Sequence, residues 1–589
     1  MPKIILCTLL AAVFSFAQTT WIRINQLGYL PDSKKVAVLV SKNELSIKSF
    51  TLCDAKTGKE VFISRKIKSF GGYTAFKSSY RLDFSRFNKT GEYYIYCNTF
   101  KSPVFKINKN VYDGTADFLL NYMRQQQSGY NPFLKDSCHT HDGFIIYHPT
   151  LDSTYIDVKG GWHDASDYLQ YVTTSATAVY QMLFAYYVNP SAFGDFYDKD
   201  GNKSPNGIPD VVDEAKWGLD WLMKMNPQKN VMFNQIADDR DHNLYDLPTA
   251  DKVDYGKGKG LGRPVYYCTG KPQGPFKYKN RTTGIASTAA KYASSFALGY
   301  EVMKKYYPEF AEKIKVKAEE AYQYGLENPG VCQTAPCVSP YFYEEENWVD
   351  DMELAAAQLF KTTGKKNYLE DAVRFGRQEK VTPWMGADTA RHYQWYPFIN
   401  LGHYAVSTSK NVTYEKEFAS YIKDGIEKVY KRGEKNPFLI GIPFIWCSNN
   451  LVSAMVTQAH LYNRITGDKK YLEMEAALRD WLFGCNPWGT SMIVGLPKSG
   501  VCPKDPHSGF TLNNRYEIDG GLVDGPVYGT IYRKLLGITL HREDKFKDFQ
   551  SSYVVYHDDY GDYSTNEPTM DGTAGLIYYL SAMQTMEKK

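Results

Sequence analysis

A chain of 589 residues is too long for one ordinary hydrophobic core, so two or more domains are expected. Its composition, with 43% hydrophobic and 23% charged residues, is that of a globular protein. The net charge of +4 is small for this length and argues against nucleic-acid binding. Aromatic residues make up 15% of the chain. Their rings stack on flat sugar faces, but a tyrosine-rich core would give the same count.

The first 17 residues have the pattern of a secretory signal peptide. Lys3 supplies the positive charge, residues 4–13 the apolar stretch and residues 15–17 a small-x-small cleavage site. The apolar stretch is too short to span a bilayer, and no later stretch is long and apolar enough. We therefore expect cleavage after Ala17 and a secreted or periplasmic protein without a membrane span, most simply a monomer.

Nine cysteines remain after the signal peptide is removed, an odd number and a low density for a disulfide scaffold. Some are expected to be buried free thiols. Cys332 and Cys337 are close enough in sequence for a small-loop disulfide.

Residues 18–108 show strand patterns. Short apolar or alternating runs at 36–40, 50–53, 61–63, 93–97 and 104–107 are separated by polar and glycine-containing turns. They predict a small β-sandwich, to which we assign a structural role.

From residue 109 onward the hydrophobic period becomes helical. Helices are predicted at about 112–126, 173–188, 210–225, 284–306, 309–326, 350–363, 366–378, 390–406, 413–430, 449–465, 468–484 and 570–586. A dozen amphipathic helices joined by very unequal loops fit a helical array or a barrel of helical hairpins, and no fixed repeat indicates a consensus solenoid. The long loops, where functional residues tend to lie, are about 127–172, 189–209, 227–283, 327–349 and 485–569.

The stretch 160–168, GGWHDASDY, holds two carboxylates three residues apart in a glycine- and aromatic-rich turn. Like charges raise one another's pKa, and aromatic rings partly exclude water. Asp164 and Asp167 could be a helix cap with a first-turn acid, or surface turn residues. The alternative is that at least one of them is a catalytic base.

A second acidic stretch, 558–567, precedes the last apolar helix and ends in Glu567. Capping and dipole effects need one or two acids, whereas this stretch has four with interleaved tyrosines. A carboxyl group among aromatic rings and other acids has a raised pKa, which suits a general acid. A base and an acid far apart in sequence are what glycoside hydrolysis requires.

These motifs resemble those of glycoside hydrolase family 9. Residues 160–168 are similar to its GGW-x-DAGD-Y signature, with Ser166 in place of the glycine, and residues 562–567 to its DY-x-x-NE signature. Residues 208–221 resemble its PD-x-x-DE helix, 446–449 its WGSN and 484–487 its G-x-NP. The motifs occur in family order over about residues 110–586, and residues 20–107 resemble the immunoglobulin-like domain of one branch of the family.

The resemblance implies an all-α (α/α)6 barrel at 109–589 behind an immunoglobulin-like sandwich at 18–108. It also implies an inverting reaction in which Asp167 deprotonates water, Asp164 helps to hold that water and Glu567 protonates the leaving oxygen. Inversion needs a gap of roughly 6.5–9.5 Å between the two carboxyl groups.

For substrate binding, His507 occupies the position of the family's substrate-contacting histidine. The motifs that follow depart from the family: His507-Ser508-Gly509 lacks the local arginine, for which Arg515 is a substitute candidate, and Gly572 replaces a tyrosine. A satisfied loop histidine is the alternative reading of His507. Aromatic candidates for substrate contact are Trp162, Tyr168, Trp348, Trp395, Trp446, Trp488 and Tyr563.

Zinc is a candidate cofactor. Cys138, His139 and His163 match three of the four ligands used by the branch with the immunoglobulin-like domain, but the fourth, usually a cysteine, is Ser128 here, a poor ligand. His141 is an alternative fourth ligand, and a hydrogen-bonded His/Cys turn is the alternative without metal.

Calcium is a second candidate. Residues 198–204 alternate oxygen side chains like the first half of a calcium loop, but no bidentate acid stands at the twelfth position. The candidate ligands are Asp198, Asp200, Asn202, Asp210 and Asp213. A solvated turn is the alternative, and no organic cofactor is expected.

Together these patterns predict a secreted endo-β-1,4-glucanase that hydrolyses cellulose-like glucans, xyloglucan or their oligosaccharides. An exo-acting β-glucosidase or glucosaminidase on short oligosaccharides is the second enzymatic reading. The third is a non-catalytic carbohydrate-binding protein, against which the retention of all three carboxyl groups speaks.

Overall fold

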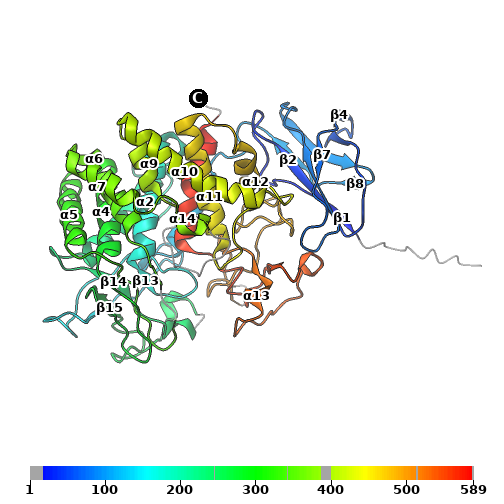
Figure 1. The fold of residues 1–589 in the computed structure, drawn as a ribbon. Coiled ribbons are helices and arrows are strands. Elements are labelled where there is room, and N and C mark those ends of the chain that lie inside the picture. The colour runs from blue at the N-terminus through cyan, green and yellow to red at the C-terminus, as the bar shows by residue number, and fades with distance from the viewer. Residues whose placement is uncertain (1–17, 244–245, 341–342, 387–398, 513–514, 587–589) are drawn as a thin grey trace, which may run out of the picture.

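The computed structural model describes residues 18–243, 246–340, 343–386, 399–512 and 515–586 (Figure 1). The predicted signal peptide, Trp395 and the first part of the helix predicted at 390–406 lie outside the described residues. The N-terminal strands form a sandwich at one side of a large helical body (Figure 1).

The sandwich consists of two antiparallel sheets, in the orders β1-β2-β6-β5 and β4-β3-β7-β8, with β9 also pairing with β7. Their strands are β1 (Thr20–Arg23), β2 (Val36–Ser41), β3 (Phe50–Asp54), β4 (Glu60–Ser64), β5 (Ile67–Ser69), β6 (Ser78–Asp83), β7 (Gly91–Cys97), β8 (Phe100–Lys101) and β9 (Phe105–Ile107). All five predicted runs are strands; β1, β5, β6 and β8 were not predicted because they are short or polar.

Strand β2 explains why residues 36–40 are apolar without alternation. Ala37 and Leu39 lie in the core of the sandwich, whereas Val38 and Val40 lie in the core shared with the helical domain. Since successive side chains point to opposite faces of a strand, β2 is buried on both of its faces.

The helices are α1 (Thr115–Gln125), α2 (Val172–Val188), α3 (Asp210–Met225), α4 (Ala286–Met303), α5 (Pro308–Glu327), α6 (Val349–Thr363), α7 (Lys366–Gly376), α8 (Pro383–Gly386), α9 (Leu401–Ser407), α10 (Val412–Gly433), α11 (Ser448–Thr466), α12 (Leu472–Leu482), α13 (Gly529–Tyr532) and α14 (Met570–Thr585). Each of the twelve predicted helical segments contains one of them; α8 and α13, each a single turn, were not predicted.

In the part of the chain that the structure describes, six helices close an inner ring. Contacts run from α2 to α4, α6, α9, α11 and α14 and back to α2. An outer helix packs on each inner one, for example α5 on α4, α7 on α6, α10 on α9 and α12 on α11. This is the (α/α)6 barrel that the sequence predicted.

The inner helices are buried on almost every side, and their many small and apolar residues allow this. Helix α4 presents Ala289, Ala293 and Ala297, all completely buried, because small side chains let neighbouring helices approach closely. Outer helices such as α10 bury one stripe only, including Phe418, and leave the opposite face in water.

The loops contain strands that the sequence did not reveal. β12 (Phe144–Ile146), β15 (Pro264–Tyr267), β14 (Phe233–Ile236) and β13 (Gln170–Tyr171) form one mixed sheet in that order. Two further pairs are β10 (Gly129–Asn131) with β11 (Asp136–Cys138) and β16 (Val527–Tyr528) with β17 (Val554–Val555). The mixed sheet ties the loop before α2 to the loop between α3 and α4.

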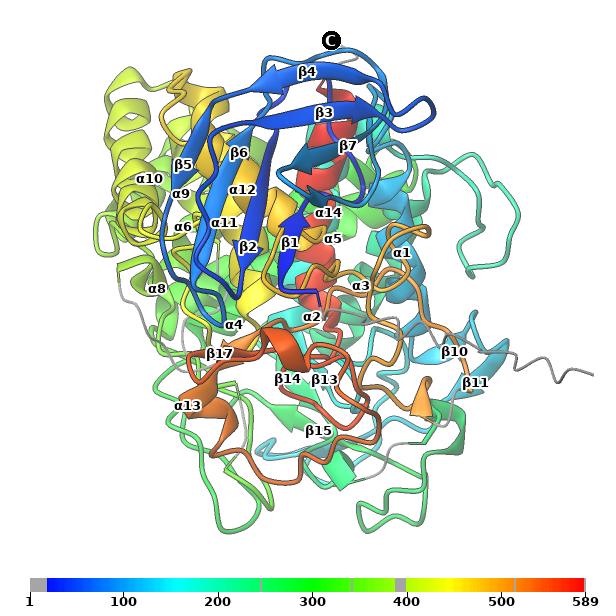
Figure 2. The ribbon, with the colours of Figure 1, turned by 90° about the vertical axis from the view of Figure 1, so that its right-hand side faces the viewer.

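Figure 2 views the molecule from the sandwich side, with β1, β2 and β6 in front of α11 and α12. The contact is polar as well as apolar. Arg81 pairs with Glu473 at 3.0 Å and donates to the carbonyl of Pro437 at 2.8 Å, while Asn25 donates to Asp480 at 2.8 Å. The sandwich is therefore fastened to α12 by specific polar contacts, of which Asn25–Asp480 is buried.

The nine described cysteines are all buried free thiols, so the Cys332–Cys337 disulfide considered from spacing is not formed. Among the described residues, no helix combines the length and apolar character that crossing a membrane requires.

Candidate active site

The predicted catalytic residues meet at one end of the barrel, where the inner helices begin. Asp164 and Asp167 lie in the turn before α2, and Glu567 lies shortly before α14. The two segments are joined directly, because the main-chain N–H of Met570 donates to the carbonyl of Asp164 at 3.0 Å.

The glycines of the GGW stretch make room for tryptophans. Gly161 has φ +72, and a Cβ there would lie 2.6 Å from the ring of Trp221; a Cβ on Gly218 would lie 2.2 Å from Trp162. Trp162 is fully buried, and its indole N–H donates to Oε1 of Glu214 at 2.7 Å. The predicted substrate contact of Trp162 is therefore corrected: its ring packs inside the barrel and anchors the turn.

Asp164 is held on both oxygens. Thr174 of α2 donates to Oδ1 at 2.7 Å, and Tyr343, from the loop before α6, donates to Oδ2 at 2.6 Å. Burial, followed by the nearby charges of Asp167 and Asp571, raises the pKa of Asp164 well above its usual value. Asp164 is thus fixed in place by two neighbouring segments and does not titrate in the ordinary range.

Asp167 faces a histidine that the sequence did not single out. Its Oδ2 lies 3.0 Å from Nε2 of His242, and its side chain is 11% exposed. Burial opposes the charged imidazolium, but the Asp167 carboxylate outweighs it and raises the pKa of His242 to about 9. Asp167 and His242 therefore form an ion pair at the centre of this turn.

His242 reaches Asp167 through the mixed sheet. Strand β14 ends at Ile236 and the chain continues into the turn Asp241–Asn243, which carries the histidine. The turn is fixed by Asp241, whose Oδ2 accepts the main-chain N–H of Tyr168 at 3.2 Å. No local sequence pattern marks this contact, because β14 and the catalytic turn are about 70 residues apart.

Glu567, in contrast, tends to keep its proton. Burial, and then the charge of Asp167, raise its pKa to about 7. The main-chain N–H of Ser166 donates to its Oε1 at 3.0 Å, and the Ser166 hydroxyl donates to the same oxygen. A carboxylic acid that keeps its proton up to near-neutral pH beside an ionised carboxylate is an acid–base pair.

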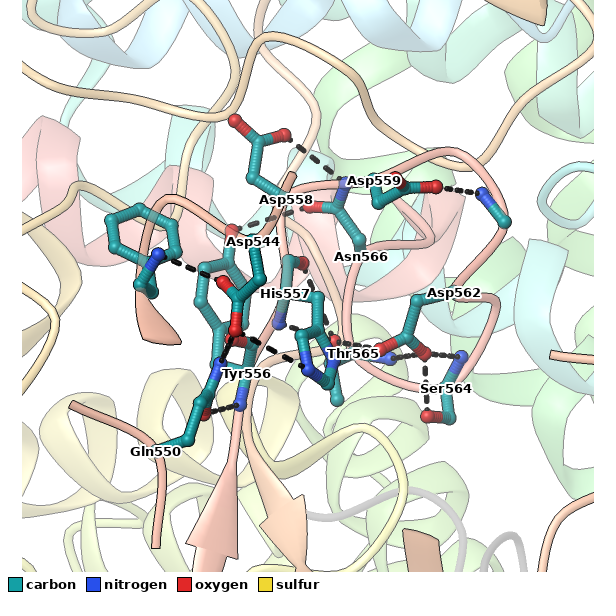
Figure 3. A network of polar contacts seen from close by, with 12 residues as sticks. Asp544, Gln550, Tyr556, His557, Asp558, Asp559, Asp562, Ser564, Thr565 and Asn566 are labelled. Carbon is teal, nitrogen blue, oxygen red and sulfur yellow. Dashed lines mark hydrogen bonds and ion pairs between the residues drawn. The ribbon is translucent and has the colours of Figure 1, made fainter. Parts of the chain in front are cut away.

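The other acids of the 558–567 stretch are structural (Figure 3). Asp562 is completely buried and accepts hydrogen bonds from Ser564, from Thr565 and, at 2.7 Å, from Nδ1 of His557. These donors, led in effect by His557, outweigh burial and lower the pKa of Asp562.

Asp558 and Asp559 bind neighbouring loops. Asp558 accepts the main-chain N–H groups of Lys504 and Asp505, and Asp559 accepts those of His541 and Arg542. Of the four acids, Glu567 alone is left to act on a substrate.

Aromatic candidates divide into two groups. Trp446 and Tyr563 are half-buried and stack with ring centroids 5.3 Å apart at 27°, next to the loop that carries Glu567. Trp488 and Tyr168, both candidates for substrate contact, are each 2% exposed, so neither ring has a face open to a sugar. Trp348 packs edge-on against Phe375.

His507, which was predicted to contact substrate, packs beside the 558–567 stretch. Its ring packs edge-on to Tyr563 at 6.1 Å, and its Nδ1 is hydrogen-bonded to the carbonyl of Tyr560. Burial lowers its pKa, so the ring is neutral near pH 7. Arg515 pairs with Asp246 at 2.7 Å on the surface rather than with His507.

Packing against α11 explains why residue 572 is a glycine. A Cβ there would lie 2.1 Å from Oδ1 of Asn450 on α11, so the space that the family's tyrosine would need is occupied.

Three of the predicted zinc ligands come together. Ligand atoms of Cys138, His139 and His163 lie within 4.8 Å of one another. Nδ1 of His139 is 3.0 Å from Nε2 of His163, and Nδ1 of His163 is buried without a hydrogen-bond partner. Ser128 is completely buried beside Cys138. The set can hold a cation through three ligands, but its fourth position is a hydroxyl; His141 is exposed and pairs with Thr140 instead.

The predicted calcium ligands have hydrogen-bond or ion-pair partners within the protein, and calcium binding by them stays a prediction. Asp210 forms a buried ion pair with Arg124 at 3.0 Å and accepts main-chain N–H groups of Phe196 and Tyr197. The remaining members each pair locally: Asp198 with Asn202, Asp200 with Lys199, and Asp213 with Asn206 and Tyr307.

A barrel of helical hairpins that brings together Asp167, before its first inner helix, and Glu567, before its last, has the architecture of a hydrolase acting through two carboxyl groups. The model of glycosyl hydrolase family 9 matches residues 112–580, and that of the cellulase N-terminal Ig-like domain matches residues 17–102. The chain belongs to glycoside hydrolase family 9.

Individual relatives cover nearly the whole chain. The xyloglucan-specific endo-beta-1,4-glucanase of Bacteroides ovatus is 25% identical over 96% of this chain and 94% of its own length. A metagenome-derived family 9 endoglucanase has the same fold, with a TM-score of 0.75 at 23% identity over 96% of this chain and 99% of that one. A Zn-binding triple mutant of the family 9 endoglucanase J30 is similar too, with a TM-score of 0.74 at 22% identity over 94% and 99%.

Proposed function

We propose that this protein is an inverting endo-β-1,4-glucanase. The observation that carries the proposal is the pairing of an acid whose pKa is raised to about 7, Glu567, with a carboxylate held beside the His242 cation, Asp167. The two electrostatic environments suit the two carboxyl groups to different roles, Glu567 to that of the acid and Asp167 to that of the base, as acid–base hydrolysis requires.

The proposed reaction uses each group once. Asp167 takes a proton from a water molecule while the water oxygen attacks the anomeric carbon from the face opposite the leaving group. The glycosidic C–O bond breaks, and the proton of Glu567 moves to the leaving oxygen. Asp164, fixed by Thr174 and Tyr343, helps to hold the water. Proton exchange with solvent then restores both carboxyl groups.

The substrate class follows from the relatives and from the aromatic residues. Relatives over the full chain length are named as endoglucanases, one of them xyloglucan-specific. Trp446 and Tyr563, stacked on one another and half-buried, offer a ring surface beside Glu567 on which a pyranose can stack. We therefore propose β-1,4-linked glucans, including xyloglucan, as substrates.

An exo-acting enzyme for short gluco- or glucosaminyl-oligosaccharides is the second candidate. It is favoured by the changed loop at His507, where the family's arginine is missing and Arg515 is paired with Asp246. Product profiles separate the two: an endo-enzyme shortens soluble xyloglucan or carboxymethylcellulose and lowers its viscosity early, whereas an exo-enzyme releases one short product and leaves the viscosity high.

Hydrolysis of cello-oligosaccharides followed by proton NMR tests the mechanism. We expect the α-anomer as first product from a β-linkage. Glu567→Ala should lose most turnover of natural substrate and regain part of it on an aryl glycoside, whose leaving group needs no acid. A β-anomeric first product, or normal glucan turnover by Glu567→Ala, would contradict the proposal.

We further propose export with cleavage after Ala17 and a monomeric enzyme. N-terminal sequencing of the secreted protein and light scattering test these two points.

For the metal, we propose that Cys138, His139 and His163 bind zinc weakly, because Ser128 cannot supply a thiolate as the fourth ligand. Zinc when bound would brace the loops carrying these residues and would take no part in the acid–base steps. Metal analysis after dialysis should show well under one zinc per chain, and Ser128→Cys should raise the content toward one and raise the Tm. Equal zinc content in the two proteins would refute this proposal.

A further inference from the structure

Ser166 stands at the position where the family signature has glycine. It lies between the two catalytic aspartates of the turn, one residue before Asp167 and two after Asp164. Its side chain is 7% exposed, so it is packed into the site and is not a surface substitution. A glycine there would keep the main-chain N–H but would have no hydroxyl.

Both donors of Ser166 point at one atom. Its main-chain N–H lies 3.0 Å from Oε1 of Glu567, and its Oγ–H donates to the same Oε1. Among the described residues, Oε2 of Glu567 has no hydrogen-bond partner. Glu567 as a whole is half-buried, and Ser166 binds only its Oε1.

Two donors on one carboxyl oxygen decide where its proton resides. An oxygen that already accepts an N–H and an O–H is the carbonyl oxygen of the acid, so the proton occupies the other oxygen. Since Ser166 occupies Oε1, the proton available to a leaving group is the one on Oε2.

We propose that Ser166 is a positioning residue for the catalytic acid: its hydroxyl and its main-chain N–H together hold Oε1 of Glu567, so that the transferable proton sits on Oε2. The inference rests on the proposed role of Glu567 as the acid. It assigns to this chain a second donor that the glycine of the family signature lacks.

The hydroxyl also changes the acidity of Glu567. A hydrogen bond donated to a carboxylate favours the charged form, so the Ser166 hydroxyl lowers the pKa of Glu567 against burial and the Asp167 charge, which raise it. Other titratable groups facing Glu567 are the cation His242 and the neutral or acidic groups Tyr122, Cys447, Asp524 and Tyr563. Ser166 variants leave all of them in place.

The test is the pH dependence of kcat/KM on a natural glucan for Ser166→Ala, Ser166→Gly and Ser166→Thr. Because activity requires protonated Glu567, the alkaline limb follows the pKa of that group. Loss of the hydroxyl should move this limb to higher pH by about 0.5–1 unit in the Ala and Gly variants. Ser166→Thr retains a hydroxyl and should restore the wild-type profile.

The leaving group supplies a matched comparison. Below the pKa of Glu567, the Ala and Gly variants should lose roughly 3- to 10-fold of kcat on glucan, because the proton is no longer confined to Oε2. On an aryl glycoside, which needs no acid, they should keep wild-type kcat. A merely structural role for Ser166 would lower both activities together and leave the alkaline limb unmoved; that result would overturn the proposal.

A direct titration separates this inference from the proposed function. If no β-1,4-glucan is cleaved by the wild-type protein, the proposed function fails, and ¹³C NMR of labelled glutamate carboxyls, assigned through Glu567→Gln, still reports the pKa of Glu567. A higher pKa in Ser166→Ala than in the wild type and in Ser166→Thr supports the inference. Equal pKa values in the three proteins refute it whatever the activity.

Discussion

The two loops that carry the carboxyl groups use their acids in opposite ways. In the turn before α2, Asp164 and Asp167 are bound by side chains from other segments, Thr174, Tyr343 and His242, and face the reaction centre. In the loop before α14, the preceding acids are bound mostly by main-chain N–H groups and hydroxyls of their own or adjoining loops (Figure 3). The 558–567 stretch has more acids in its sequence than the turn before α2, yet only Glu567 is left for the reaction. The hydrogen-bond donors around each carboxylate distinguish it from the other three acids.

Asp167→Asn should give the largest effect on activity. The amide keeps the shape but cannot take a proton from water, so we expect kcat on glucan to fall by roughly 10²- to 10⁴-fold. The Tm should also fall at neutral pH, because the variant loses the carboxylate that pairs with the buried His242 cation. A variant that kept a tenth of the activity would show that the turn before α2 does not hold the base.

Asp562→Ala should affect stability instead. It removes a buried carboxylate that binds His557, Ser564 and Thr565, and leaves those donors without an acceptor. We expect a loss of about 3 kcal/mol in the free energy of unfolding, measured by urea denaturation. Asp548→Ala, at an exposed position of the same region, is the matched control and should be neutral. Equal stability of the two variants would make Asp562 a candidate for chemistry.

His242→Gln tests the cation beside the base. The raised pKa means that the charge of His242 stabilises the folded state fully below its unfolded value of about 6.5, and that this contribution is lost as pH rises through about 9. The Tm of the variant should thus lie below that of the wild type at neutral pH and approach it at higher pH. A Tm difference that is independent of pH would show that the imidazolium does not stabilise Asp167.

Glu567→Gln should change the Tm least of these variants, and it should raise the Tm rather than lower it. A carboxyl group whose pKa rises to about 7 on folding costs stability once pH exceeds its unfolded value of about 4.5. The neutral amide avoids this cost, so the Tm of the inactive variant should exceed that of the wild type by roughly 1–4 °C above pH 7. An unchanged Tm there would mean that burial does not perturb this acid.

Local pattern was sufficient for most of the fold. The 3.6-residue period located the barrel helices because each outer helix has one buried stripe, as α10 shows. The sheet β12-β15-β14-β13 was missed, since its strands have two to four residues each and pair across distant loops. Long-range pairing of short strands leaves no periodic trace.

In the site, too, local motifs could be predicted from the sequence and long-range contacts could not. Asp164, Asp167 and Glu567 stand in recognisable motifs, whereas His242 reaches Asp167 only through strand β14. Trp162 was assigned to substrate because it neighbours the acids, but Gly161 and Gly218 give its ring a place in the core. The choice between core and cleft for an aromatic ring depends on glycines that are distant in sequence from it.

The docking of the sandwich has a consequence for how the enzyme is made. Arg23 and Gln26 bind the carbonyl of Pro487 and the main-chain N–H of Val501, the first stretch of the loop that leads to His507. Since translation runs from the N-terminus, this docking surface is synthesised before the loop that settles on it. Helix α14 emerges after the other ring helices and closes the ring between α11 and α2, bringing Glu567 with it. A nascent chain stalled just before α14 holds Asp167 in a ring that is still open, so catalytic competence requires that α14 has been made.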